Sequence, residues 1–235
     1  MDERLMGTRR AFLKSGIFMG GAALAGVGVL RAADREKDKE EEEVSPAEDL
    51  MREHGVLKRV LLIYEEAIRR MTPNQELPVE TVADSAKIIR NFIEDYHEKL
   101  EENFLFPRFE KAGKLTDLVK TLRDQHQAGR RVTDLTLGLA KQSTIKNGDE
   151  RAQLADSLRQ FIRMYNPHEA REDTVLFPAF RKIVSANEYA SLGEDFEKKE
   201  HELFGEDGFE KMVDKVTNIE KKLGIYELAQ FTPKI

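Results

Sequence analysis

The sequence predicts an all-α protein, an up-and-down four-helix bundle with one or two extra C-terminal helices. Its clearest feature is the pattern H-E-x-x-E-x-x-x-L-F-P-x-F, which starts at His97 and again at His168, seventy-one residues later. Four stretches of the chain also carry apolar residues at helical spacing. Seven prolines and an abundance of Glu, Lys, Leu and Ala favour helix over strand.

The repeat extends towards the N-terminus. A Leu-x-x-x-His motif ends at His54 and again at His126, and basic residues follow four positions later at Lys58 and Arg130. The repeated unit is therefore one helix with a His, followed by one helix with a His and a Glu. Two copies of such an αα-hairpin predict a four-helix bundle with an approximate two-fold axis.

Proline, glycine and capping residues predict where each helix begins and ends. We expect Pro167 to bend the fourth helix locally and Pro107 to kink or loosen the second, since proline lacks the backbone N–H that a helix needs. The expected helices run from about Pro46 to Arg70, Pro78 to Ala112, Leu115 to Lys141, and from near Glu150 onwards.

The N-terminus looks like a bacterial twin-arginine export signal. Arg9 and Arg10 precede a Phe-Leu-Lys run, and an apolar run of sixteen residues follows from Ser15 to Leu30. The alternative is a basic amphipathic anchor or a short membrane span, but a span needs about 20 apolar residues. Arg31 spoils a clean cleavage pattern, so an uncleaved N-terminal anchor stays open.

The export signal and the predicted helices divide the chain into four parts. These are a signal peptide (1–33), a charged linker (34–45), the four-helix bundle (46–183) and a C-terminal helical extension (184–235). The export signal predicts a periplasmic or cell-envelope location, the twin-arginine translocase as partner during export, and membrane contact only through a retained signal. The net charge is −6, and without residues 1–33, which hold five basic and two acidic residues, it becomes −9. So acidic a protein is a poor nucleic-acid binder.

Four histidines and two glutamates form the candidate site. Each histidine lies on the apolar side of a different helix, and each glutamate lies four residues after a histidine, on the same helix face. The set is His54, His97, Glu101, His126, His168 and Glu172. Core histidines that only donate hydrogen bonds are the alternative, but buried carboxylates are costly unless they are paired or bind a metal. The chain has no cysteine, so a metal must take imidazole and carboxylate ligands.

The paired motifs resemble those of the hemerythrin-like, HHE cation-binding family, over about residues 47–182. The resemblance implies a bundle that holds two non-heme iron ions. It implies that the four histidines are terminal ligands and that Glu101 and Glu172 bridge the irons. His54 and His97 would hold one metal, and His126 and His168 the other. Imidazole and carboxylate also accept manganese and zinc.

One departure from the family's oxygen carriers bears on function. Where they have a second histidine on the third helix, this chain has Arg130, and Glu172 replaces an aspartate one residue further on. Each iron should therefore keep open positions, which argues against oxygen transport.

Five further residues are singled out. Glu98 and Glu169 point about 100° away from the ligand face on an ideal helix, so we expect them behind the ligands or at the surface. Tyr96 and Tyr165 are expected to pack in the core, with a hydrogen bond to a metal-bound oxygen species as the alternative. His201 lies beyond the repeat and is expected at the surface.

These features predict an exported di-iron protein that binds or reduces oxygen, peroxide or nitric oxide. A non-enzymatic iron or metal sensor or buffer of the cell envelope is the alternative, because it would use the same ligands. A metal-free bundle that binds another protein is a third hypothesis. No nucleophile, acid-base pair or phosphate loop indicates other chemistry, and whether the protein is an enzyme stays open.

Overall fold

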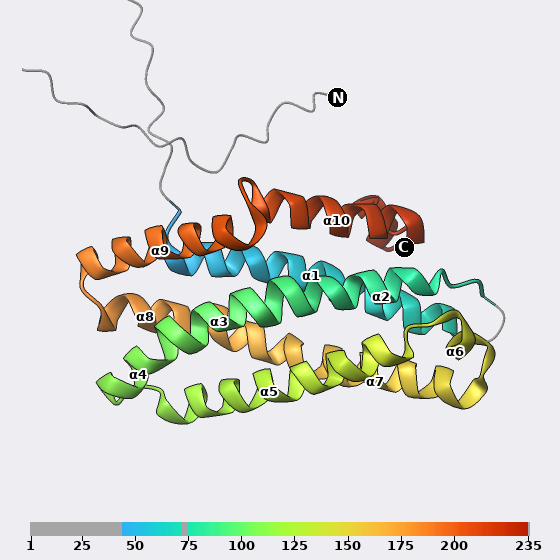
Figure 1. The fold of residues 1–235 in the computed structure, drawn as a ribbon, viewed down its shortest axis with the longest axis horizontal. Helices are drawn as coiled ribbons and strands as arrows, with labels where there is room; N and C mark the ends of the chain where they lie inside the picture. The colour runs from blue at the N-terminus through green and yellow to red at the C-terminus, as the bar shows by residue number, and fades with distance from the viewer. Residues whose placement is uncertain (1–43, 72–74, 235) are drawn as a thin grey trace, which may run out of the picture. The chain divides into compact units, whose positions relative to one another are not determined.

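The computed structural model describes residues 44–71 and 75–234, and every regular element in these ranges is a helix (Figure 1). The predicted signal peptide and nearly all of the predicted linker lie outside the described residues. Among the described helices, none combines the length and the apolar character needed to span a bilayer.

The described chain forms the predicted four-helix bundle. The first helix is α1 (Pro46–Met71) and the third is α5 (Thr116–Leu139). The second consists of α2 (Val79–Ile88), η1 (Ile89–His97), α3 (Glu98–Leu100), η2 (Glu101–Leu105) and α4 (Phe106–Ala112). The fourth consists of α7 (Gly148–Arg171), η3 (Glu172–Leu176) and α8 (Phe177–Ile183). Contacts of α1 with α2 and α7, and of α5 with α2 and α7, close the ring.

Local signals explain the helix ends. The hydroxyl of Ser45 accepts from the N–H of Glu48, and Gly113 ends α4 in the left-handed conformation. The side chain of Asn147 caps α7 by accepting from the N–H groups of Asp149 and Glu150. One short helix, α6 (Gln142–Lys146), was not predicted.

The C-terminal extension packs on the outside of the bundle. The side chain of Ser185 caps α9 (Ala186–Phe204), and α10 (Gly208–Leu223) and a short 3-10 turn, η4 (Leu228–Phe231), follow. Both α9 and α10 contact α1, and α10 also contacts α2. Arg59 of α1 forms two hydrogen bonds with Glu220 of α10.

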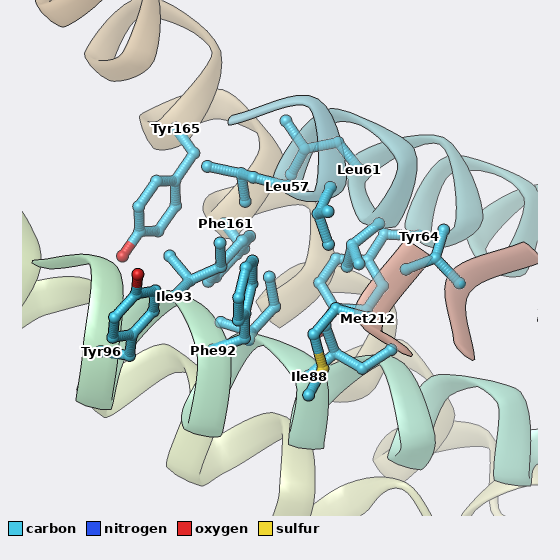
Figure 2. Packing of buried hydrophobic residues seen from close by; sticks show 14 of the residues in the cluster. Leu57, Leu61, Tyr64, Ile88, Phe92, Ile93, Tyr96, Phe161, Tyr165 and Met212 are labelled. Carbon is cyan, nitrogen blue, oxygen red and sulfur yellow. The ribbon is translucent and has the colours of Figure 1, made fainter. Parts of the chain in front are cut away.

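Apolar side chains from the bundle helices and α10 fill the core. Figure 2 shows Leu57 and Tyr64 of α1 and Phe161 of α7 in this cluster. Tyr64 and Phe161 pack edge to face with ring centroids 5.6 Å apart. The core fixes the four helices around the candidate site.

The distortion predicted at Pro107 is a π-helical turn that directly precedes the Phe106-Pro107 pair. Pro107 lies in the first turn of α4, and the turn before it is a π-helix, in which the N–H of Phe106 donates to the carbonyl of Glu101. The wider turn accommodates a residue without an N–H. The second repeat does the same, with Phe177 donating to Glu172 before Pro178. At Pro167, by contrast, α7 continues as an α-helix.

Candidate metal centre

The structure brings the six predicted ligands together in the middle of the bundle. They form two groups, His54, His97 and Glu101 in one, and His126, His168 and Glu172 in the other, all buried. Within each group, one potential ligand atom per residue lies within 4.8 Å of the others. Every helix of the bundle therefore contributes one histidine, and the second and fourth helices add a glutamate each.

Both glutamates lie between the two groups. Glu172 Oε2 is 3.1 Å from His168 Nε2 and 3.4 Å from His54 Nε2, which belongs to the other group. Glu101 Oε2 is 3.4 Å from His126 Nε2 and 3.9 Å from His97 Nε2. Each carboxylate therefore faces histidines of both groups and could help to hold a metal in either.

The outer nitrogen of every candidate histidine has an acceptor. His97 Nδ1 donates to Glu53 at 2.7 Å and His168 Nδ1 to Gln125 at 2.9 Å. Since the acceptors are carboxylate or amide oxygens, they fix the proton on Nδ1 and leave Nε2 towards the centre, the arrangement that metal-binding histidines adopt.

The other two histidines are held by the opposite half of the repeat. His54 Nδ1 donates to Asp173 at 2.8 Å, and His126 Nδ1 donates to Glu102 at 3.1 Å. Asp173 and Glu102 follow the two candidate bridging glutamates at equivalent positions of the repeat. The internal two-fold symmetry thus includes the groups behind the ligands. The type of acceptor group differs at one pair, where the carboxylate of Glu53 in the first copy corresponds to the amide of Gln125 in the second.

Phenylalanines of the L-F-P motifs pack against the site. Phe177 stacks on His54 with ring centroids 5.6 Å apart, and Phe106 stacks on His126 at 5.4 Å. Both phenylalanines, together with Phe109 and Phe180, are buried. These rings belong to the core, and Phe177 and Phe106 shield the histidines on which they stack.

Glu98 and Glu169 are buried behind the ligands, so the surface alternative was wrong. Arg130 Nη2 lies 2.7 Å from Glu98 Oε2, and at the equivalent place of the repeat Lys58 pairs with Glu169. Each of the two glutamates is paired with a basic residue of a neighbouring helix. The geometry of a single ideal helix does not predict such a contact. Arg130 also contacts Glu102 Oε1 at 2.8 Å, so its guanidinium supports the acceptor of His126.

Both tyrosines are core residues, as expected. Tyr165 donates a hydrogen bond to Glu98 Oε1 at 2.6 Å, and its ring contacts His168 with centroids 5.3 Å apart. Gly129 of α5 makes room for this hydroxyl, since a Cβ there would lie 2.1 Å from Tyr165 Oη. Tyr96 is equally buried, and His201 is exposed, as expected.

Burial and neighbouring charges both shift the pKa values of the site, and they oppose one another at His54 and Glu172. Burial lowers the pKa of His54, but Asp173 and Glu172 outweigh it and raise the pKa to about 10. Burial, and next the charge of Glu172, raise the pKa of Glu101 to about 7. Burial also opposes ionisation of Glu172, yet His168 and His54 hold its pKa well below the ordinary value. The two carboxylates therefore demand positive charge beside them.

The carboxylate oxygens support a metal as that positive charge. All four oxygens of Glu101 and Glu172 are buried, and none forms a hydrogen bond of good geometry within the described residues; histidine Nε2 atoms lie nearby, at 3.1 to 3.9 Å. Buried carboxylate oxygens with so few hydrogen bonds are costly. Metal ions between the two groups would satisfy them, so the residues fit a pair of cations.

A cavity leads from the surface to one side of the site. It lies between α5 and α7, has a volume of about 380 Å³, and His168 and Gln125 belong to its wall. Thr121 and Arg171 line it further out. The cavity therefore reaches His168 and its acceptor Gln125, on one side of the second group.

Sequence reasoning missed Glu53, Glu102, Gln125 and Asp173. Their acceptor role depends on contacts between helices, which periodicity within one helix does not show. A signal was nevertheless present, because all four directly flank a candidate ligand, and they occupy equivalent positions of the two copies.

Known proteins resemble the chain in two ways. The hemerythrin HHE cation binding domain profile matches residues 45–180. Three relatives, one from Mycobacterium bovis and two from Mycobacterium tuberculosis strains, are 53% identical over 195 residues, which cover 83% of this chain and 76% of each relative. All three are named as uncharacterized proteins. No solved structure matches the chain. The chain belongs to the hemerythrin HHE cation-binding domain family.

Proposed function

We propose that the protein binds two non-heme iron ions and uses them to bind or reduce a small oxidant, namely oxygen, peroxide or nitric oxide. The observation that carries this proposal is the pair of buried glutamates, each of which faces histidine Nε2 atoms of both groups. When bound, an iron pair supplies electrons to a small molecule.

The chain's own residues have three tasks in this proposal. Four histidines and two glutamates hold the metals. Glu53, Glu102, Gln125 and Asp173 orient the imidazoles, and the phenylalanine rings keep water out. Arg130 is drawn towards Glu98 and Glu102, so it supports the site instead of adding a ligand. With four histidines and two glutamates as ligands, the site would leave room for a small molecule beside the metals.

The test is to mix the reduced, iron-loaded protein with peroxide, oxygen or nitric oxide and follow the visible spectrum and turnover. We expect a reaction that is lost in Glu172→Ala. Thr121→Trp should fill the cavity and slow the reaction without changing the iron content, whereas Lys120→Trp, outside the cavity wall, should leave the rate unchanged. Reversible binding without turnover would favour the sensor or buffer alternative. Iron-loaded protein that reacts with none of the three would contradict the proposal.

We also propose that the protein is exported by the twin-arginine route and acts in the periplasm or cell envelope. The support is the sequence of residues 1–33, with Arg9 and Arg10 before an apolar run. Because this route carries folded proteins, it fits a protein whose metals are bound before it crosses the membrane.

A further inference from the structure

A second cavity lies away from the metal centre, between α10 and the α2–η1 stretch. We call it the α10 groove. Its volume is about 760 Å³, within the range of about 300–1,000 Å³ of small-molecule sites. None of the six candidate ligands lines it. The α10 groove is therefore a separate candidate binding site.

The floor of the α10 groove is apolar. It consists of Ile88, Met212 and Ile219, which are buried, and of Phe204 at the end of α9. Figure 2 shows Ile88 and Met212 side by side at the edge of the core. At the mouth, Leu203 is 49% exposed. An apolar, elongated ligand would cover these side chains.

Lysines stand along the α10 side of the groove. Lys215 and Lys222 lie seven residues apart, on the same face of α10. Neither forms an ion pair with a carboxylate within the described part of the chain, and Lys215 Nζ donates a hydrogen bond to Met212 Sδ at 3.9 Å. In a chain of net charge −6, two lysines without acidic partners beside an apolar floor favour an anionic ligand.

The directions of the helices show which lining residues lie at the same end of the groove. Arg52, Arg59 and Arg70 of α1 contact Phe209, Glu220 and Leu223 respectively, so α10 runs parallel to α1. Because neighbouring bundle helices are antiparallel, α10 runs opposite to α2.

Lys222 therefore lies at the same end of the groove as Lys87 and Asp84. Lys87 Nζ is 2.9 Å from Asp84 Oδ1, so Lys87 neutralises the charge of Asp84. Asp95 lies at the other end, beside Leu203 and Phe204. An anion is favoured at the Lys222 end and repelled by Asp95 at the other.

We propose that the α10 groove binds a long-chain fatty acid. Its carboxylate pairs with Lys222, with Lys215 next along the rim, and its alkyl chain covers Ile219, Ile88 and Met212 and ends at Leu203 and Phe204. The groove offers an apolar floor for the chain and a cationic end for the head, and a single-chain carboxylate matches both.

The alkyl end of the ligand would contact a layer next to the metal centre. Phe204 packs edge to face on Phe92 and Tyr96, with ring centroids 5.6 and 5.4 Å apart, and Tyr96 precedes the candidate ligand His97. Occupancy of the groove is therefore expected to change the environment of Tyr96.

The test is a calorimetric titration of the purified full-length protein with hexadecanoate, with hexadecan-1-ol and hexadecyltrimethylammonium as uncharged and cationic probes. We expect saturable binding of one hexadecanoate per chain and weaker binding of both other probes. Lys222→Glu should weaken hexadecanoate binding about tenfold or more, as expected for losing a hydrogen bond to a charged group. Leu203→Asp, at the alkyl end, should weaken it as well.

Lys198→Glu is the matched control, since Lys198 is exposed on α9, lies outside the groove and undergoes the same charge change. It should bind hexadecanoate as the unmodified protein does. The inference is overturned if hexadecanoate does not bind, if the cationic probe binds equally well, or if Lys222→Glu and Lys198→Glu behave alike. It is also overturned if sedimentation shows a dimer that occupies the groove and excludes hexadecanoate. Glu172→Ala should not alter this binding, so the metal proposal is tested separately.

Discussion

At the scale of single residues, the acceptors behind the histidines set the orientation of the imidazole rings. Asp173 accepts from His54 Nδ1 at 2.8 Å and fixes which nitrogen faces the centre. We expect Asp173→Ala to lower metal affinity about 10- to 100-fold, since loss of such an acceptor costs that much at metal sites. A competition titration against a chromophoric chelator measures it.

Asp124→Ala is the control for this prediction. Asp124 is an exposed aspartate of α5 that pairs only with Lys120 among the described residues. Its substitution should leave metal affinity unchanged. Equal affinities of the two variants would mean that Asp173 does not orient a ligand.

Two glycines of the same helix give a matched pair for stability. A Cβ at Gly129 would lie 2.1 Å from Tyr165 Oη, whereas a Cβ at Gly138 meets nothing within 4 Å. We expect Gly129→Ala to lower the free energy of unfolding by about 1–3 kcal/mol, the usual cost of overpacking. Gly138→Ala should raise it by about 0.5–1 kcal/mol, because alanine favours helix over glycine. Urea unfolding measures both, and shifts of the same sign would refute the role of Gly129.

Residue patterns predicted part of this arrangement. Helical spacing and the repeat singled out His54, His97, Glu101, His126, His168 and Glu172, and the structure brings them together, while their role as ligands stays a prediction. The sequence patterns did not predict the histidine acceptors or the ion pairs of Glu98 and Glu169, because each of these contacts depends on a side chain from another helix.

At the scale of elements, the π-helical turns set the register of the site. Glu101 and Glu172 each begin such a turn, and each turn ends one residue before a Phe-Pro pair. The prolines predicted a distortion, but proline alone does not say how the backbone adjusts. The wider turn also lets Phe106 and Phe177 stack on the histidines of the opposite half.

The π-helix η1 carries a fully buried carboxylate, Glu94, whose pKa burial raises to about 7 despite a hydrogen bond from Thr133. Below the unfolded pKa of 4.5, Glu94 is protonated in both states. As the pH rises to 7, the unfolded state loses this proton first, so Glu94 reduces stability progressively. Glu94→Gln removes this titration and keeps an acceptor for Thr133.

We therefore expect the unfolding free energy of the unmodified protein, relative to Glu94→Gln, to fall between pH 5 and pH 8 by on the order of 1–3 kcal/mol. Urea unfolding at both pH values, with equal metal loading, measures the difference. Parallel stability profiles would show that Glu94 titrates normally.

At the scale of the whole molecule, export is the prediction that rests on sequence alone. Replacing both Arg9 and Arg10 by lysine should leave the protein inside the cell, because the translocase reads the paired arginines. Arg4→Lys, outside the pair, should be exported normally. Fractionation of cells that carry each variant measures the distribution, and export of the double variant would contradict the twin-arginine route.

The all-α bundle was predictable because the chain repeats itself. Four amphipathic stretches with short connections permit few arrangements, and the motif copies fixed which faces point inward. The α10 groove was not predictable, since it arises from how α10 packs against α2, and the amphipathic pattern of α10 does not specify which bundle helix it covers.

The metal content per chain of protein purified under native conditions, compared with that of Glu101→Ala and Glu172→Ala, decides whether the di-iron centre exists. We expect about two irons per chain, with visible absorption that changes on exposure to oxygen. We expect loss of the colour and of most of the iron in both variants, because each glutamate faces both groups of histidines. Protein with no metal, or with one colourless zinc that either variant retains, would contradict the di-iron centre.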